Sequence, residues 1–269
     1  MRMASSLVAL YVDHAYKAIA RKSEVLFCTG QSLHERYGRL ARKSVVIANF
    51  LHSAKDVRPP DRRSIGLSCR ILFVGHLEER KGLIYLLRGV RLLADEGIET
   101  HLTIVGTGPL RAQLAESAAN LGLCEVEFID YIQYGQELLD QYRRADIFVL
   151  PSISSEGMPK VLMEAMSQGT PVVSTDVGSS RHLLCSGQFG LLVSPRNERH
   201  LADAIKTLIG DNELRDRLID SGLALARNST RDVQASKVKE ALESVVPEIL
   251  GTPAYHAKEG NNQSVRLLR

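Results

Sequence analysis

The sequence predicts an α/β fold built on a doubly wound parallel sheet. From residue 70 to residue 193, short apolar runs alternate with longer amphipathic segments, as expected for parallel strands joined by helices. The predicted strands cover residues 70–74, 100–105, 126–129, 145–150, 170–174 and 190–193. Five predicted helices lie between these strands, at residues 81–96, 110–121, 136–144, 160–168 and 179–185. Three more follow the last strand, at residues 198–209, 213–228 and 232–246.

Two unequal domains and a tail are expected. Residues 64–250 hold all six predicted strands and form a complete lobe. Residues 1–63 hold two helices and two strands, at 7–21, 24–28, 33–40 and 44–48. A segment of about 60 residues buries too little surface for a core of its own, so it is predicted to be the remnant of a larger lobe. Two prolines mark residues 58–68 as a linker, and the polar residues 251–269 are predicted to be disordered.

The charge of the chain limits the kinds of partner that it can bind. The net charge of +3 is too small to indicate a nucleic-acid partner. Residues 1–63 are richer in Lys and Arg than in Asp and Glu, and such a segment faces phosphates, an acidic membrane surface or solvent. Peripheral contact with the inner face of a membrane and a solvated surface therefore both stay open.

The four cysteines and the start of the chain indicate a cytoplasmic protein. The cysteines are far apart and lie in apolar runs, which is typical of reduced core residues and gives no metal site: Cys28, Cys69, Cys124 and Cys185. The apolar run near residues 7–12 is too short to span a membrane, and we interpret it as part of an amphipathic helix rather than a signal peptide.

Residues 152–169, SISSEGMPKVLMEAMSQG, are the most informative stretch. Two carboxylates, Glu156 and Glu164, flank a predicted loop-to-helix junction, with Pro159 suited to the first helical turn. Unpaired amides at a helix start attract anions, and parallel sheets bind ligands beyond the carboxyl ends of their strands. This stretch therefore predicts a site for a ligand with phosphates and hydroxyls. Two solvated surface acids are the alternative.

The flanking residues SSEGMPKVLMEAM and GTPVVSTDVG make the motif more specific. Glu156, seven residues and Glu164 resemble the paired-glutamate signature of the group 1 (family 4) retaining glycosyltransferases. That family has the GT-B fold, with two Rossmann-like lobes facing a cleft. By this resemblance, the chain covers the end of the N-terminal, acceptor-side lobe and the whole C-terminal, nucleotide-sugar-binding lobe.

The resemblance also implies roles for individual residues. Glu164 would hold the ribose hydroxyls of the nucleotide, Glu156 would lie beside the donor sugar, and Lys81 would meet the diphosphate. Lys81 and Glu156 are accordingly the candidate catalytic residues. The candidate donor-binding residues are Gly75, His76, Lys81, Gly82, Ile132, Glu156, Gly157, Met158, Pro159, Lys160, Val161 and Glu164.

Several positions depart from the family pattern. His76 stands at the family's arginine, and histidine lacks the permanent bidentate charge that arginine offers to phosphate. Arg80 either compensates or is solvated. Asp130 replaces a glycine near the expected base contact, so the nucleotide base stays open, and His182 replaces an acid.

A glycine-rich turn follows the second strand of the larger lobe. Residues 105–109, VGTGP, resemble a turn that lines the family's cleft, and a simple tight turn fits them equally well. A dinucleotide fingerprint would need a third glycine where Arg111 stands.

The expected function is transfer of a sugar, with retention, from a nucleotide-diphospho-sugar to a hydroxyl of a glycan or lipid-linked acceptor, as in polysaccharide biosynthesis. No metal or other cofactor is expected. Two alternatives stay open. One is an inactive or split-enzyme donor-binding lobe whose missing lobe comes from a partner chain. The other is a sugar-nucleotide epimerase of the same shape.

Overall fold

The computed structural model describes residues 2–48, 50–58, 65–66, 68–154 and 156–245. It contains two compact units. The larger comprises Thr29–Ser32 and Ala48–Gln234, and the smaller comprises Met1–Cys28, Leu33–Ile47 and Ala235–Arg269. The predicted tail and most of the predicted linker lie outside the described residues, and the division into lobes at residues 63 and 64 stays a prediction.

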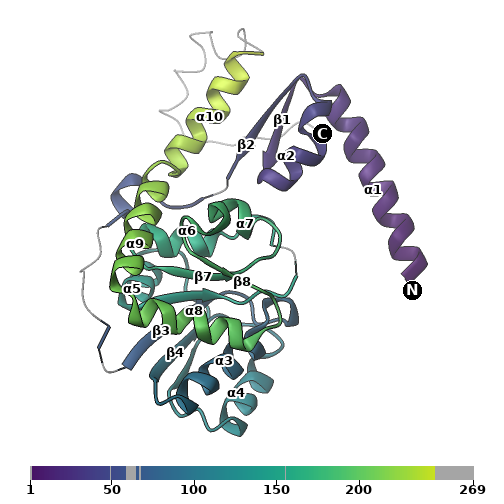
Figure 1. The fold of residues 1–269 in the computed structure, drawn as a ribbon. Helices are drawn as coiled ribbons and strands as arrows, with labels where there is room; N and C mark the ends of the chain where they lie inside the picture. The colour runs from purple at the N-terminus through teal and green to yellow at the C-terminus, as the bar shows by residue number, and fades with distance from the viewer. Residues whose placement is uncertain (1, 49, 59–64, 67, 155, 246–269) are drawn as a thin grey trace. The chain divides into compact units, whose positions relative to one another are not determined.

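The larger unit is built on a six-stranded parallel sheet, which confirms the predicted fold class (Figure 1). The spatial order is β5-β4-β3-β6-β7-β8. The chain thus builds outward from β3 to β5 and then returns to the other side of β3 with β6. The strands are β3 (Ser68–Val74), β4 (Glu99–Val105), β5 (Val126–Ile129), β6 (Ile147–Leu150), β7 (Val172–Thr175) and β8 (Leu191–Val193).

The central strands form because their side chains are apolar on both faces. All four residues of β6 are buried, and Phe73 and Leu72 of β3 are almost fully buried. Such continuous apolar runs are typical of parallel strands covered on both sides. The register sets Ile71 of β3 beside Ile147 of β6.

Helices connect and cover the strands (Figure 1). Among them α3 packs against α8, and α6 packs against α9. The helices of this unit are α3 (Leu83–Asp95), α4 (Arg111–Asn120), α5 (Gln136–Arg144), α6 (Lys160–Ser167), α7 (Ser180–Leu183), α8 (Glu198–Gly210) and α9 (Asn212–Arg227).

Two residues expected in the first turn of a helix, Lys81 and Pro159, lie before it instead. The helix predicted from residue 81 begins at Leu83, because Glu79–Lys81 form a 3-10 turn and Gly82 is left-handed, with φ 64°. Pro159 is the N-cap of α6 rather than its first helical residue. In both cases the residue named as the opening of a helix lies in the loop before it.

The remaining elements include a two-stranded sheet of β1 and β2. These elements are α1 (Arg2–Lys22), β1 (Val25–Thr29), α2 (Gln31–Tyr37), β2 (Lys43–Ile47) and α10 (Arg231–Glu243), with short 3-10 turns at Gly38–Leu40, Ala54–Asp56 and Cys185–Gly187. Asp13 of α1 accepts from Lys17, Tyr37 and Arg36, and these partners lower the pKa of its carboxyl to about 2.

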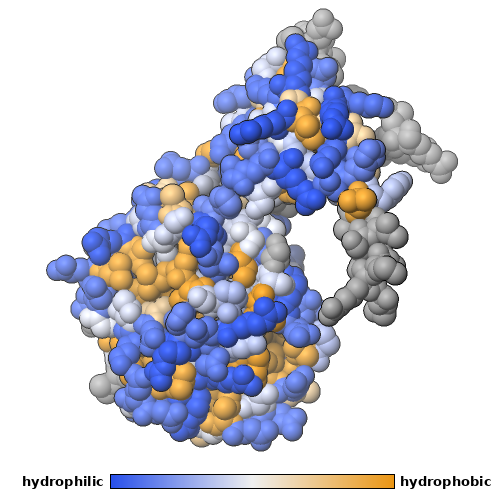
Figure 2. Space-filling model, turned by 45° about the vertical axis from the view of Figure 1, so that its right-hand side comes forward, coloured by the Kyte–Doolittle hydropathy of each residue, from blue (hydrophilic) through white to orange (hydrophobic). Residues whose placement is uncertain are grey.

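Part of α1 is apolar and exposed, notably Leu10, Tyr11, Tyr16 and Ile19. In Figure 2, apolar patches are scattered among hydrophilic residues over the visible face. Among the described residues, no helix combines the length and the apolar character that crossing a membrane requires.

Candidate functional site

The candidate site lies at the carboxyl ends of β3 and β6, where the strand order of the sheet reverses. Open α/β sheets bind ligands in the crevice at such a switch point. Two loops meet there, one after each strand, and the amide of Ile153 donates to the carbonyl of Arg80 at 2.8 Å. Gly82 makes this approach possible, because a Cβ on it would lie 2.2 Å from the carbonyl oxygen of Pro151.

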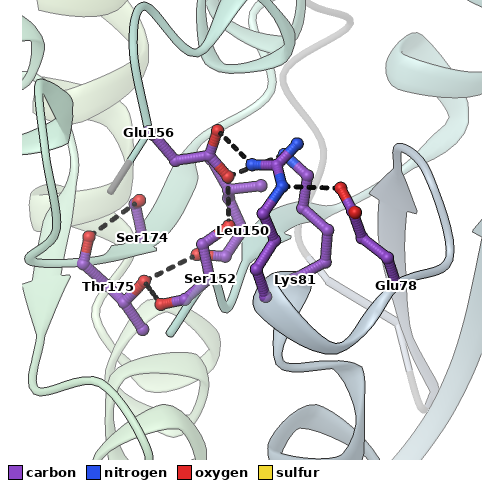
Figure 3. Close-up of polar contacts among 8 residues, drawn as sticks. Glu78, Lys81, Leu150, Ser152, Glu156, Ser174 and Thr175 are labelled. Carbon is purple, nitrogen blue, oxygen red and sulfur yellow. Dashed lines mark hydrogen bonds and ion pairs between the residues drawn. The ribbon is translucent and has the colours of Figure 1, made fainter. Parts of the chain in front are cut away.

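Glu156 is the centre of a buried polar cluster (Figure 3). Lys81 Nζ lies 2.6 Å from Glu156 Oε1, and the hydroxyl of Ser152 donates to the same oxygen. Arg80 Nη1 lies 3.5 Å from Glu156 Oε2, and Arg80 Nε pairs with Glu78 at 2.6 Å. The side chains of Lys81 and Glu156 are only 11% and 8% exposed, so water screens their attraction weakly.

Backbone contacts fix the position of Glu156. Its carbonyl accepts from the amide of Ser179 at 2.9 Å. Gly178 packs so closely that a Cβ on it would lie 2.2 Å from that carbonyl oxygen. Thr175, at the end of β7, donates from Oγ1 to the carbonyl of Ser152 at 2.5 Å. The loop after β6 is therefore tied to the loop after β7.

A cavity of about 350 Å³ opens at the same edge of the sheet. The loops after β3, β4 and β5 and the side chain of Glu164 line it. Four of the predicted donor-binding residues share this cavity: Gly75, His76, Ile132 and Glu164.

Glu164 is buried, with 6% of the residue exposed. Its Oε2 accepts a hydrogen bond of 2.8 Å from the hydroxyl of Tyr142. Burial raises the pKa of the Glu164 carboxyl, while the bond from Tyr142 and the charge of Lys160 act in the opposite direction. A carboxylate held in this way can accept hydroxyl groups of a ligand.

The glycine-rich turn after β4 has a structural explanation. A Cβ on Gly106 would lie 2.0 Å from the carbonyl oxygen of Gly75, and a Cβ on Gly108 would lie 2.4 Å from that of Leu77. The amide of Leu77 also donates to the carbonyl of Thr107 at 2.9 Å. The two glycines therefore serve backbone packing between the first two loops of the site, whether or not a ligand contacts them.

Asp130, a departure from the family pattern, is paired with Arg111, the residue at the third-glycine position of a dinucleotide fingerprint. Arg111 Nε donates to Asp130 Oδ1 at 3.2 Å, and the guanidinium lies 5.6 Å from the ring centroid of Phe128. The arginine after the glycine-rich turn thus pairs with the acid near the expected base contact. His182, another departure from the family pattern, is exposed on α7.

The other predicted residues lie at the start of α6. Gly157 is exposed, Pro159 is buried, and Met158, Lys160 and Val161 are partly buried. The N-cap residue Pro159 gives no side-chain hydrogen bond to the first amides of this helix. The structure thus gathers the predicted residues into two groups, one around Glu156 and one around Glu164. The roles assigned to them stay predictions.

Sequence reasoning missed Ser152 and Tyr142. Ser152 is the first residue of the stretch 152–169 but was given no role, because a hydroxyl four residues before a carboxylate is a weak signal. Tyr142 reaches Glu164 across 22 residues from another helix, and no spacing rule indicates this contact. The part of the chain that the structure describes holds no group of three or more His, Cys, Asp or Glu side chains suited to a metal. The absence of a metal requirement stays a prediction.

A doubly wound parallel sheet, with buried polar groups and a cavity at the carboxyl ends of its strands, defines an α/β domain of the Rossmann-like class. The family model described as "Glycosyl transferases group 1" matches residues 65–224. The chain belongs to this family.

Two curated relatives illustrate the similarity. The phosphatidyl-myo-inositol mannosyltransferase of Mycobacterium leprae is 32% identical over 181 residues, which cover 65% of this chain and 46% of the relative. The lipopolysaccharide core biosynthesis glycosyltransferase LpsE of Rhizobium meliloti is 30% identical over 208 residues, or 75% of this chain and 58% of the relative. The chain spans about half the length of the curated relatives it matches.

Solved structures confirm the GT-B fold. A glycosyltransferase from Rickettsia africae superposes with a TM-score of 0.73 at 18% identity, covering 88% of this chain and 67% of that one. HepE from Anabaena, solved with UDP and glucose, gives a TM-score of 0.69 at 20% identity, covering 86% of this chain and 66% of that one.

Proposed function

We propose that this chain carries the donor-binding lobe of a glycosyltransferase, which moves a sugar with retention from a nucleotide-diphospho-sugar to a hydroxyl acceptor. The observation that carries the proposal is the meeting of Lys81 and Glu156 at the switch point, 2.6 Å apart. The cavity beside Glu164 opens at the same edge of the sheet. A cation, two carboxylates and an uncapped helix start suit a ligand that combines a diphosphate, a ribose and a sugar.

Each group has a place in the chemistry. The bond between the anomeric carbon and the diphosphate oxygen breaks, and its electron pair leaves with the diphosphate. The acceptor hydroxyl oxygen bonds to the anomeric carbon on the same face, and its proton passes to the departing phosphate oxygen. Lys81, Arg80 and the start of α6 stabilise that negative charge, which is the main demand of such a step. Glu156 orients the hydroxyls of the donor sugar, and Glu164 holds the ribose. Neither carboxylate needs to act as a glycosidase-type acid or nucleophile.

The acceptor is a hydroxyl of a glycan or a lipid-linked sugar in this proposal. Two relatives are named for phosphatidyl-myo-inositol and for lipopolysaccharide core biosynthesis, which supports that chemical class. Peripheral contact with the inner face of a membrane, a cytoplasmic location and a partner chain that supplies an acceptor lobe belong to the same proposal.

Calorimetric titration with UDP, GDP and UDP-sugars tests the donor site. Binding is expected, and Lys81→Ala and Glu164→Ala should each weaken it by at least about tenfold, since each removes a charged contact. Lys206→Ala is the matched control, because Lys206 Nζ also lies 2.6 Å from a carboxylate, Glu96, but outside the site. Failure to bind any of these ligands at millimolar concentration would contradict the proposal.

Turnover separates the two functions that a donor-binding lobe can serve. Transfer of sugar from a bound UDP-sugar to a glycan or lipid-linked acceptor, followed by mass spectrometry, supports an active enzyme. If the chain binds the donor but transfers no sugar, and a second chain restores the transfer, the split enzyme is supported. Appearance of a 2-epimerised sugar nucleotide instead would overturn the transferase.

A further inference from the structure

Tyr142 is a fully buried residue of α5 whose hydroxyl reaches the cavity carboxylate. It donates to Glu164 Oε2 at 2.8 Å. Two further contacts hold Tyr142 in place. Its ring centroid lies 5.4 Å from that of Phe148 on β6, with the ring planes inclined by 54°. Its carbonyl accepts from Thr170 Oγ1 at 2.6 Å. The position of this hydroxyl is therefore set by contacts with α6, with β6 and with Thr170, which lies before β7.

The hydroxyl also matches the electrostatic need of its neighbour. Burial raises the pKa of the Glu164 carboxyl, and the hydrogen bond from Tyr142 is the largest contribution that lowers it. Tyr142 stays a donor throughout the neutral range, because burial and the nearby Glu164 charge raise the pKa of its phenol well above the ordinary value. A charge-assisted bond of this kind favours the ionised carboxylate.

We infer that Tyr142 is a positioning residue of the donor site, whose hydroxyl orients the Glu164 carboxylate toward the ribose hydroxyls of the nucleotide. The inference rests on the proposed function, in which Glu164 accepts from the ribose. An ionised carboxylate offers about four acceptor positions, so the bond to Tyr142 leaves capacity for both ribose hydroxyls. Without that bond the buried carboxylate turns freely or takes up a proton, and a protonated carboxyl accepts less well.

The test is Tyr142→Phe, which keeps the ring and removes only the hydroxyl. Its matched control is Tyr37→Phe, because Tyr37 donates to Asp13 at the same distance of 2.8 Å in the smaller unit. Calorimetry with UDP, GDP and their 2′-deoxy counterparts, from about pH 5 to about pH 8, measures affinity and its pH dependence.

Three changes are expected for Tyr142→Phe and none for Tyr37→Phe. Affinity for the ribonucleotide falls about tenfold, the size of one lost hydrogen bond to a charged group. The preference for the ribonucleotide over the 2′-deoxynucleotide shrinks, because the ribose contact is the one disturbed. The pH at which binding is half lost on acidification moves upward. A purely structural role would lower stability and leave the ribose preference and the pH midpoint unchanged.

Failure of this inference is distinct from failure of the proposed function. If the wild type binds UDP or GDP and Tyr142→Phe keeps both the ribose preference and the pH midpoint, the positioning role is overturned and donor binding stands. If the wild type binds no nucleotide, both are overturned. If Tyr142→Phe does not fold, Thr170→Val serves as the test, because it removes the hydrogen bond to the carbonyl of Tyr142. An upward shift of the pH midpoint of binding then supports the positioning role. An unchanged midpoint overturns it.

Discussion

Lys81 and Glu156 form an ion pair across the switch point of the sheet. The Nζ–Oε1 distance is 2.6 Å, although 75 residues separate the two in the chain. One belongs to the loop after β3 and the other to the loop after β6, so the pair joins the two halves of the sheet. A diphosphate that draws Lys81 toward itself leaves Glu156 to Arg80 and Ser152, which already contact it.

Removing one partner of this pair should destabilise the fold. We expect Lys81→Met to lower the free energy of unfolding by about 3 kcal/mol, because it leaves a buried carboxylate without its closest cation. The double variant Lys81→Met/Glu156→Gln should recover most of the loss. Urea unfolding measures the free energy of unfolding of the wild type, the single variant and the double variant. At the exposed pair of Lys206 and Glu96, Lys206→Met should change stability by less than about 1 kcal/mol, and equal losses at the two lysines would contradict the argument.

Gly82→Ala should be more harmful than its size suggests. The residue has φ 64°, and an added Cβ would lie 2.2 Å from the carbonyl oxygen of Pro151. We expect a loss of more than about 1 kcal/mol in thermal or urea unfolding, together with weaker nucleotide binding, because the loop that carries Lys81 must move. Gly210→Ala is the control, since a Cβ there meets no atom within 4 Å. A neutral Gly82→Ala would show that the two loops are not held together here.

Glu164→Gln should stabilise the protein and abolish its nucleotide binding. Burial raises the pKa of Glu164 above the ordinary value of 4.5, so the folded state binds the proton more tightly than the unfolded state. The ionised side chain therefore costs stability at neutral pH, and the glutamine variant escapes that cost. Its advantage should shrink as pH falls through the folded-state pKa and vanish below the unfolded value. Unfolding of both proteins measured from about pH 4 to about pH 8 tests this sign, and an advantage over the wild type that grows on acidification contradicts it.

The cysteines should divide into two reactivity classes. Cys124 and Cys185 are exposed, whereas Cys28 and Cys69 are buried. Burial raises the pKa of the Cys28 thiol, and it raises that of Cys69 to about 12, so neither is a thiolate at pH 8. A thiol reagent should label the two exposed residues within minutes and all four only after denaturation. Rapid native labelling of Cys69 would show that the sheet opens at the amino end of its central strand β3.

The parts of the fold that followed from the sequence were those governed by local pattern. The six strands were predicted correctly because each contains a short apolar stretch, which in the fully buried β6 is uninterrupted. The start of α3 was misplaced because Lys81 and Gly82 are compatible with a helix in sequence. Only the close approach of Pro151, a contact with a distant loop, requires the left-handed conformation.

The candidate site was predictable as a set of residues rather than as a set of contacts. Glu156, Glu164 and Lys81 were singled out because motifs mark them. Their partners depend on how β3, β6 and α5 come together. The pairing of Arg111 with Asp130 is a further example, since the two were noticed separately, Arg111 after the glycine-rich turn and Asp130 in place of a family glycine.

The strand order has a consequence for synthesis of the protein. Among the strands of the six-stranded sheet, β3, β4 and β5 leave the ribosome first and lie side by side, and one edge of β3 is unpaired until β6 follows. The loops of the cavity are then already translated, while Glu164 follows only after β6. Pairing of β6 with the open edge of β3 is thus followed by synthesis of α6, the next helix, which carries Glu164. A ligand in the cell that needs this carboxylate stabilises only those nascent chains that have passed this step, and not earlier ones.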